Sequence, residues 1–226
     1  MFVSDLWAIL DTQGLGRIVA LSLVVSISAT ALATLAGMMF GAALAVCSFR
    51  GRRALVILTN AFLGLPPVVV GLALYLLLSR SGPLGITGLL FTPGAMVVAQ
   101  FILATPIVTA FVHRAVEDAW GQFGGALMVD GASRFRAIPH LLAVSGVQVV
   151  GAILARFGRT VSEVGAILIV GGNIAGYTRT MTTAIVLETG KGNLSLALGL
   201  GLVLIGVSIA VSATIFALGM RGGRGW

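Results

Sequence analysis

Ionisable side chains are scarce in this chain, and the longest stretch that concentrates them covers residues 113–140. Only 9% of all residues are charged, and long apolar segments flank this stretch on both sides. Its ionisable members are His113, Arg114, Glu117, Asp118, Asp130, Arg134, Arg136 and His140. Residues 130–136 form a short, basic and amphipathic pattern with a glycine, Gly131, near its start. This pattern predicts a polar helix that contacts a partner outside the apolar part of the protein.

A second polar stretch, residues 156–166, could bring charges of opposite sign together. If the stretch is helical, Arg156, Arg159 and Glu163 share one face, and Arg159 and Glu163 could form an ion pair. Charges inside an apolar layer are costly unless they are paired or face water. This face is therefore expected to look toward a partner helix or a solute path. An ion pair at the edge of the layer, reaching into the polar interface, is the alternative.

Residues 171–183 form a glycine-rich segment with many hydrogen-bond donors. Glycine allows the backbone to approach a ligand closely, while Asn173, Thr178 and Arg179 add polar donors and a positive charge. Such a segment could bind a small oxyanion. Loops of this composition often bind nothing, so composition alone leaves both interpretations open.

Several kinds of chemistry are disfavoured by the residue types present. The only lysine, Lys191, is followed by Gly192, so no nucleotide-binding phosphate loop can be written. Two histidines, one cysteine and seven acidic residues are too few and too dispersed for a recognisable metal site or hydrolase triad. The net charge of +7 comes from arginines scattered at segment ends, which disfavours nucleic-acid binding. We therefore expect no catalytic residue, bound cofactor, metal site or nucleic-acid partner.

The elements that position these polar stretches are predicted to be membrane-spanning helices. Hydrophobic residues make up 58% of the chain, and its mean hydropathy is +1.09. Five apolar runs are long enough to cross a bilayer. We predict an all-α, polytopic membrane protein with a single transmembrane domain over residues 1–226, spans near 18–49, 54–79, 89–115, 137–158 and 194–220, and a polar helix near 120–136. Residues 164–174 are too short to cross and fit a re-entrant element, with part of a sixth span as the alternative.

Glycine and proline residues predict how the spans pack and bend. Gly37 and Gly41 are spaced for a close approach between helices. Pro66 and Pro67 in the second span, and Pro106 in the third, are expected to kink or interrupt their helices. These bends could shape or gate a pathway, or they could serve packing alone. A different role is predicted at Thr92-Pro93, which has the pattern of a cap followed by a first-turn proline.

Basic residues predict the orientation of the spans. If the first span ends inside, the cytoplasmic segments hold arginines 50, 52, 53, 114, 134, 136, 221 and 224, whereas the first two outer segments hold Arg17 and Arg80. This distribution places the N-terminus outside, the C-terminus in the cytoplasm and residues 113–140 in the cytoplasm.

Residues 126–144 resemble the cytoplasmic coupling loop of ABC importer permeases. The family pattern is Glu-Ala-Ala, three residues, Gly, nine residues, Ile, one residue and Leu-Pro. Gly131 stands at the glycine position, and Ala132-Ser133-Arg134 is a common continuation in this family. The flanks depart from the pattern, because residues 125–127 read Gly-Ala-Leu and residues 141–144 read Leu-Leu-Ala-Val.

Residues 162–191 are similar to the tungstate-type branch of the molybdate, sulfate and tungstate permeases. The matching segments are Ser-Glu-Val-Gly-Ala at 162–166, Val-Gly-Gly-Asn-Ile at 170–174, Gly-Tyr-Thr-Arg at 176–179 and Thr-Thr-Ala-Ile-Val-Leu-Glu-Thr at 182–189. The resemblance implies a type I ABC importer permease fold in a prokaryotic cell (inner) membrane. It also implies three partners: a second copy of the chain in a homodimer, a cytoplasmic ABC ATPase dimer that binds ATP and Mg, and an extracytoplasmic oxyanion-binding protein.

The same resemblance implies roles for individual residues. The residues that it implies for coupling to the ATPase are Ala126, Asp130, Gly131, Ala132, Ser133, Arg134 and Arg136. The residues that it implies for lining or gating the translocation pathway are Pro66, Pro67, Arg156, Arg159, Ser162, Glu163, Gly172, Asn173, Thr178, Arg179, Thr182 and Thr183.

The expected function is ATP-driven import of a small oxyanion, tungstate or molybdate, with hydrolysis on the separate ATPase. Closure of the ATPase would switch access from one side of the membrane to the other. A gradient-driven anion transporter or channel is the main alternative, and a membrane scaffold that recruits a cytoplasmic protein is a third. Uptake measured with and without each partner distinguishes these classes.

Overall fold

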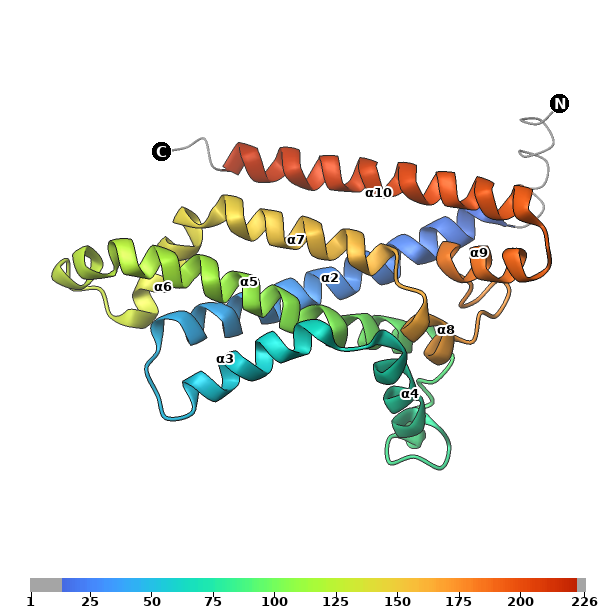
Figure 1. The fold of residues 1–226 in the computed structure, drawn as a ribbon, viewed down its shortest axis with the longest axis horizontal. Helices are drawn as coiled ribbons and strands as arrows, with labels where there is room; N and C mark the ends of the chain where they lie inside the picture. The colour runs from blue at the N-terminus through green and yellow to red at the C-terminus, as the bar shows by residue number, and fades with distance from the viewer. Residues whose placement is uncertain (1–13, 223–226) are drawn as a thin grey trace. The chain divides into compact units, whose positions relative to one another are not determined.

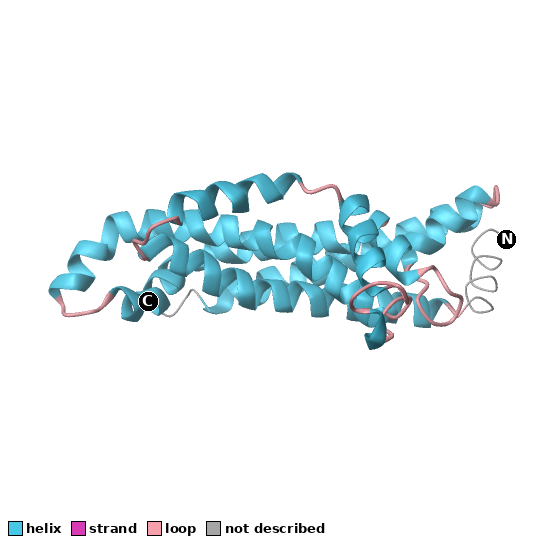
Figure 2. Cartoon of the chain, turned by 90° about the horizontal axis from the view of Figure 1, so that it is seen from below, coloured by secondary structure: helices cyan, strands magenta, loops and turns pink. Residues whose placement is uncertain are grey.

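The computed structural model describes residues 14–222, and this part of the chain is helical without any strand (Figure 2). The α-helices, labelled in Figure 1, are α2 (Leu15–Val46), α3 (Arg52–Ala61), α4 (Pro67–Leu78), α5 (Pro93–Val129), α6 (Arg134–Val144), α7 (Gly146–Val161), α8 (Gly165–Gly171), α9 (Met181–Gly190) and α10 (Leu194–Gly222). Two short 3₁₀ helices, η1 (Phe62–Gly64) and η2 (Gly85–Thr87), precede and follow α4. This architecture confirms the predicted all-α fold class.

Three of the described helices, α2, α5 and α10, are long and apolar enough to cross a membrane by themselves. The segments 52–78 and 134–161 reach the required length only as broken pairs of helices, which raises the number of candidate spans to five. The predicted five spans are thus matched by three continuous helices and two interrupted ones.

The third span and the polar helix differ from their predicted bounds. α5 continues to Val129, well past the expected end at residue 115, so no single helix covers residues 120–136. A left-handed Gly131, with φ of 83°, ends α5. The N–H groups of Gly131 and Ala132 then donate to the carbonyls of Met128 and Leu127, in a Schellman arrangement. The pattern of apolar residues does not predict that α5 ends here, because the residues on both sides of Gly131 favour a helix.

The predicted fourth span, residues 137–158, is likewise divided. α6 ends at Val144, and α7 begins at Gly146 after a bend of 72°. At the bend, the Ser145 hydroxyl donates to the carbonyl of Ala115 at 3.0 Å. The chain turns at Ser145, and the hydroxyl of this residue still has a hydrogen-bond partner inside the protein.

The prolines act differently from one another. α4 starts at Pro67, directly after the break at Leu65 and Pro66, which confirms the predicted interruption. α5 continues through Pro106, so the interruption considered there is not observed. The cap predicted at Thr92-Pro93 is confirmed, since α5 begins at Pro93 and the Ala95 N–H donates to the Thr92 hydroxyl at 3.3 Å.

The chain forms two compact units. Among the described residues, the first comprises 14–29, 66–100 and 158–211, and the second comprises 30–65, 101–157 and 212–222. α2 and α5 each contribute residues to both units. The assignment of the whole chain to one transmembrane domain stays a prediction.

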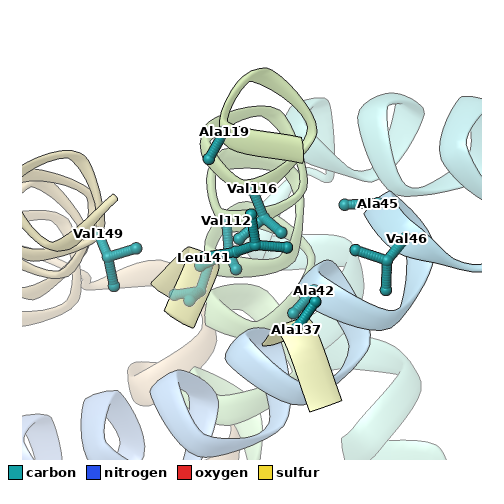
Figure 3. Packing of buried hydrophobic residues seen from close by; sticks show 10 residues of the cluster. Ala42, Ala45, Val46, Val112, Val116, Ala119, Ala137, Leu141 and Val149 are labelled. Atoms are coloured by element: carbon teal, nitrogen blue, oxygen red, sulfur yellow. The ribbon is translucent and has the colours of Figure 1, made fainter. Parts of the chain in front are cut away.

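The core of the second unit is built from small and β-branched side chains of four helices (Figure 3). Its buried members are Ala42, Ala45, Val46, Val108, Val112, Val116, Ala119, Ala137, Leu141 and Val149. The glycine prediction is confirmed here, because a Cβ on Gly37 would lie 2.6 Å from Val108 Cγ1. A Cβ on Gly41 would lie 2.7 Å from the Thr109 carbonyl oxygen. The backbones of α2 and α5 can approach so closely only because both positions lack a side chain.

In the first unit, α8 packs beside α4 (Figure 1). A Cβ on Gly71 of α4 would lie 2.8 Å from Ala166 Cα, and a Cβ on Gly165 would lie 2.8 Å from Val68 Cγ2. α8 has seven residues, which at 1.5 Å per residue is far too short to cross a bilayer. The prediction of a short element at residues 164–174 is confirmed, and no sixth span forms from this part of the described chain.

Arg52 joins two helices of the second unit to the start of α3. Its Nε donates to the Leu44 carbonyl in the last turn of α2, and its Nη2 donates to Glu117 Oε1 on α5, both at 2.6 Å. His113 Nε2 lies 3.3 Å from the same Nη2. An arginine near a helix C-terminus also interacts favourably with the helix dipole.

We expect Arg52→Met to lower the stability of the chain by about 1 kcal/mol, because the ion pair is partly exposed and the lost hydrogen bonds are partly replaced by water. For a chain of this size, that loss corresponds to a melting temperature lower by about 2–4 °C. Thermal unfolding in detergent measures the shift. Arg53→Met is the control, since Arg53 is exposed and makes no such contact in the described residues. Equal shifts in both variants would contradict the role assigned to Arg52.

Candidate translocation and coupling sites

In the first unit, the segment between α7 and α9 is held by side chains from other elements. The amide of Gln100 on α5 donates to the Thr160 carbonyl at 2.9 Å, which pairs a carbonyl at the end of α7. The Thr182 hydroxyl of α9 donates to the Glu163 carbonyl at 3.1 Å. Gln100, Thr160 and Thr182 are all buried. Sequence reasoning placed Thr182 in this site but missed Gln100, although an amide side chain within an apolar run was a visible signal.

The predicted pairing of Arg159 with Glu163 is wrong. α7 ends at Val161, so Glu163 lies beyond the last turn of the helix instead of on its face. The Glu163 carboxylate accepts the Gly165 N–H at 3.0 Å, at the start of α8. Among the described residues, no ion pair joins Glu163 to Arg159, whose side chain is exposed. Arg156 is 2% exposed, so these two arginines of α7 have different surroundings.

The glycine-rich segment folds onto itself. The Thr178 hydroxyl donates to the Gly171 carbonyl at 2.5 Å and accepts the Ile174 N–H at 2.9 Å. Asn173 takes a left-handed backbone, with φ of 50°, and its Oδ1 accepts a hydrogen bond from Arg179 Nε at 3.3 Å. The structure thus brings Asn173, Thr178 and Arg179 close together, and the Thr178 hydroxyl is used in bonds within the chain. Arg179 keeps further donors, because Nε is the only nitrogen of its side chain with a hydrogen bond to the described residues.

Thr183 and Thr180 cap α9. The Thr183 hydroxyl accepts the Thr180 N–H at 3.0 Å, and the Thr180 hydroxyl accepts the Thr183 N–H at 3.4 Å. The Met181 N–H donates to the Ser22 hydroxyl of α2 at 2.8 Å. These bonds give Thr183 a structural role at the start of a helix. Ser162, predicted with this group, is exposed, and its hydroxyl donates to the carbonyl of Gly158 at 3.0 Å.

The end of α9 carries an ion pair. Lys191 Nζ donates to Glu188 Oε1 at 2.8 Å, and Asn193 Nδ2 lies 3.3 Å from Oε2. The hydrogen bond from Lys191 outweighs the burial of the carboxyl group and lowers the pKa of Glu188. The carboxylate therefore contributes stability at neutral pH that is lost as the pH falls through this lowered pKa.

We expect Thr182→Val to destabilise the chain by about 1–3 kcal/mol, because the Glu163 carbonyl would lose its buried donor while the side chain kept its shape. Hydrogen exchange at residues 162–166 should rise in this variant. Thr189→Val is the matched control, since Thr189 lies on the same helix and is exposed. Unchanged exchange in Thr182→Val, or an equal rise in both variants, would show that the bond does not hold this segment.

In the second unit, the predicted coupling residues gather around the turn between α5 and α6. Ala126 lies on α5, Asp130, Gly131 and Ala132 form the turn, and Ser133 caps α6 by accepting the Arg136 N–H at 3.4 Å. The opposite face of α6 is buried, with Ala137 and Leu141 both 0% exposed. The buried face anchors the helix, while Phe135 and Arg136 remain exposed.

The two arginines of α6 differ in their contacts. Arg134 Nη1 donates to the Ser48 hydroxyl at 2.8 Å and to the Val46 carbonyl at 3.3 Å, so Arg134 joins α6 to the end of α2. Arg136 is exposed and makes no side-chain hydrogen bond in the described part of the chain. Arg136 is therefore the more accessible of the two for a partner protein.

Several known proteins are similar to this chain over most of its length, although no family model matches it. A probable anion ABC transporter permease protein of Haloferax volcanii is 40% identical over 190 residues, which is 82% of each chain. The tungstate uptake system permease protein of Peptoclostridium acidaminophilum is 34% identical over 89% of this chain and 88% of its own. The molybdenum transport system permease protein of Escherichia coli K12 is 33% identical over 74% of this chain and 76% of its own.

Together with the helical, multi-pass fold, these similarities define a membrane permease subunit of an ABC transporter. Within that class, the chain belongs to the family of anion permeases that includes the tungstate and molybdenum permeases. It is a transport component and a multi-pass membrane protein. None of these similarities supports the alternative of a gradient-driven transporter.

Proposed function

We propose that this chain is the transmembrane subunit of an ATP-driven importer of tungstate, with molybdate as the second candidate. The observation that carries the proposal is its similarity to the tungstate uptake permease of P. acidaminophilum over 89% of the chain. The match to the E. coli molybdenum permease covers 74%. Both anions are small oxyanions, so the same polar donors and positive charge suit either.

The ATPase is proposed to dock on the exposed face of α6 and the turn before it. This face offers Asp130, Phe135 and Arg136 to a partner, while Ala137 and Leu141 on the buried face anchor the helix to the permease. The ATPase would be a dimer that binds ATP and Mg, and the permease would act as a homodimer. An extracytoplasmic oxyanion-binding protein would deliver the solute. The N-terminus would lie outside, and α6 and the C-terminus would lie in the cytoplasm.

The anion path is proposed to involve Arg179 and the turn of residues 171–178. Arg179 retains donors beyond its bond to Asn173, and it is only partly exposed. Pro66, Pro67, Arg156, Arg159, Ser162, Glu163, Gly172, Thr182 and Thr183 would line or support the path. For Glu163, Thr182 and Thr183, the observed hydrogen bonds support a positioning role instead of direct contact with the solute.

Reconstitution in liposomes tests the proposed function. Tungstate should accumulate only when the permease is combined with its ATPase, the binding protein and ATP. Excess molybdate should compete, and sulfate measures how far selectivity extends. Accumulation by the chain alone along a concentration gradient would instead support a secondary transporter. Binding of the ATPase without any uptake would support a scaffold.

A further inference from the structure

Two adjoining apolar cavities lie in the second unit. The larger has a volume of about 670 Å³ and the smaller about 290 Å³. Both are lined by Phe40 and Leu44 of α2 and by Leu55 of α3, so they adjoin each other, and the two together are called the groove below. The smaller cavity extends the groove toward Phe62 and Pro106. Their volumes lie in or near the range of about 300–1,000 Å³ that holds small-molecule ligands.

One end of this groove is polar and basic. The larger cavity is lined there by Ser48 and Arg134. Arg134 uses only Nη1 for its hydrogen bonds to the described residues, which leaves Nη2 and Nε as donors. Two exposed arginines are close in sequence to lining residues: Arg50 follows Phe49, and Arg53 lies two residues before Leu55. The basic end of the groove therefore suits a phosphate group, since guanidinium groups bind phosphate oxygens through paired hydrogen bonds.

We propose that the groove binds an anionic phospholipid, with an acyl chain along the apolar wall and the phosphate at Arg134. An anionic phospholipid accounts for both properties of the groove, its apolar lining and its basic end. A free oxyanion would contact Arg134 but leave the apolar wall without a partner. A zwitterionic lipid would fill the wall but carry no net charge to match the arginines. Basic pockets between membrane helices recognise anionic headgroups in this way.

The proposed lipid would contact α6 through Arg134 and Phe135, the helix on which we propose that the ATPase docks. Lipid binding itself depends neither on the ATPase nor on the transported anion. A measurement of bound lipid therefore stands apart from any measurement of uptake, and either proposal can fail without the other.

Native mass spectrometry of the full chain in detergent tests the proposal, with phosphatidylglycerol and phosphatidylcholine as the two probes. We expect phosphatidylglycerol to bind about tenfold more tightly, because both lipids offer a phosphate group to Arg134 but only phosphatidylglycerol carries a net negative charge beside the arginines. Arg134→Gln should reduce phosphatidylglycerol binding to the level of phosphatidylcholine. Ala43→Phe, which places a ring in the larger cavity, should reduce the binding of both lipids.

Arg136→Gln is the matched control, because it removes the same charge from the same helix outside the groove. It should keep the preference for phosphatidylglycerol. An equal loss in Arg134→Gln and Arg136→Gln would assign binding to general surface charge and overturn the proposal. Equal binding of the two lipids by the native chain would overturn it as well. Complete displacement of the lipid when the ATPase binds would assign the groove to a protein interface instead.

Discussion

A chain carrying Gly131→Asp is expected to fold and insert, yet to lose ATP-driven uptake by at least about tenfold. Gly131 has a left-handed backbone, and aspartate tolerates this conformation better than most residues. A Cβ at this position meets no atom of the chain within 4 Å, so the substitution should leave α5 and α6 in place. A new carboxylate in a docking interface loses water without gaining a partner, at a cost of about 2–5 kcal/mol. Uptake and ATP hydrolysis by the reconstituted transporter measure the loss.

Gly131→Asn isolates the effect of charge, because asparagine has nearly the shape of aspartate and the same tolerance of a left-handed backbone. It should retain much more uptake than Gly131→Asp. Gly131→Val tests the backbone instead, since a β-branched residue is strained at this φ and should shift the turn between α5 and α6. Gly121→Ala on α5, where a Cβ also meets no atom of the chain within 4 Å, should transport normally. Normal coupled uptake in Gly131→Asp would count heavily against docking at this turn.

The second large effect is expected from Gly41→Leu, which should destabilise the chain by about 3 kcal/mol or more. A leucine would have to displace α2 from α5, because the nearest atom to its Cβ would be the Thr109 backbone carbonyl oxygen at 2.7 Å. Overpacking a well-packed core costs about 1–3 kcal/mol, and backbone relaxes less easily than a flexible side chain. The melting temperature in detergent should fall by roughly 6–12 °C.

Gly206→Leu provides the control for this change. Gly206 lies on α10, which is also a candidate membrane span, and a Cβ there meets no atom within 4 Å. The substitution adds the same volume and hydrophobicity to the chain, so it should be nearly neutral. Gly41→Ala should fall between the two, because even a methyl group reaches the Thr109 carbonyl. A melting temperature for Gly41→Leu equal to that of Gly206→Leu would show that the contact between α2 and α5 is not tight.

The pathway residues illustrate the limits of spacing arguments. Residues 156, 159 and 163 have helical spacing, but α7 ends at Val161 and the expected pair of Arg159 with Glu163 does not form. The partner of Glu163 is the Gly165 N–H, only two residues away. A hydrogen bond between a side chain and nearby backbone, such as the one at Glu163, is an alternative to continuing the helix. The contacts made by surrounding elements decide which of the two conformations forms. Gln100 and Thr182 come from distant parts of the sequence and hold the carbonyls on either side of this break.

Local composition was enough to predict an all-α, multi-pass membrane protein, the interruption at Pro66-Pro67 and the close contact at Gly37 and Gly41, because a bilayer demands long apolar helices and close helix packing demands small residues. The permease class came from the resemblance of residues 126–144 and 162–191 to a known family. Tertiary contacts were needed to show that α5 runs to Val129 and that α6 and α7 divide at Ser145. They also showed that Arg134 donates to the end of α2, whereas Arg136 makes no side-chain hydrogen bond in the described residues. These outcomes depend on hydrogen bonds between residues far apart in the chain, which no local pattern specifies.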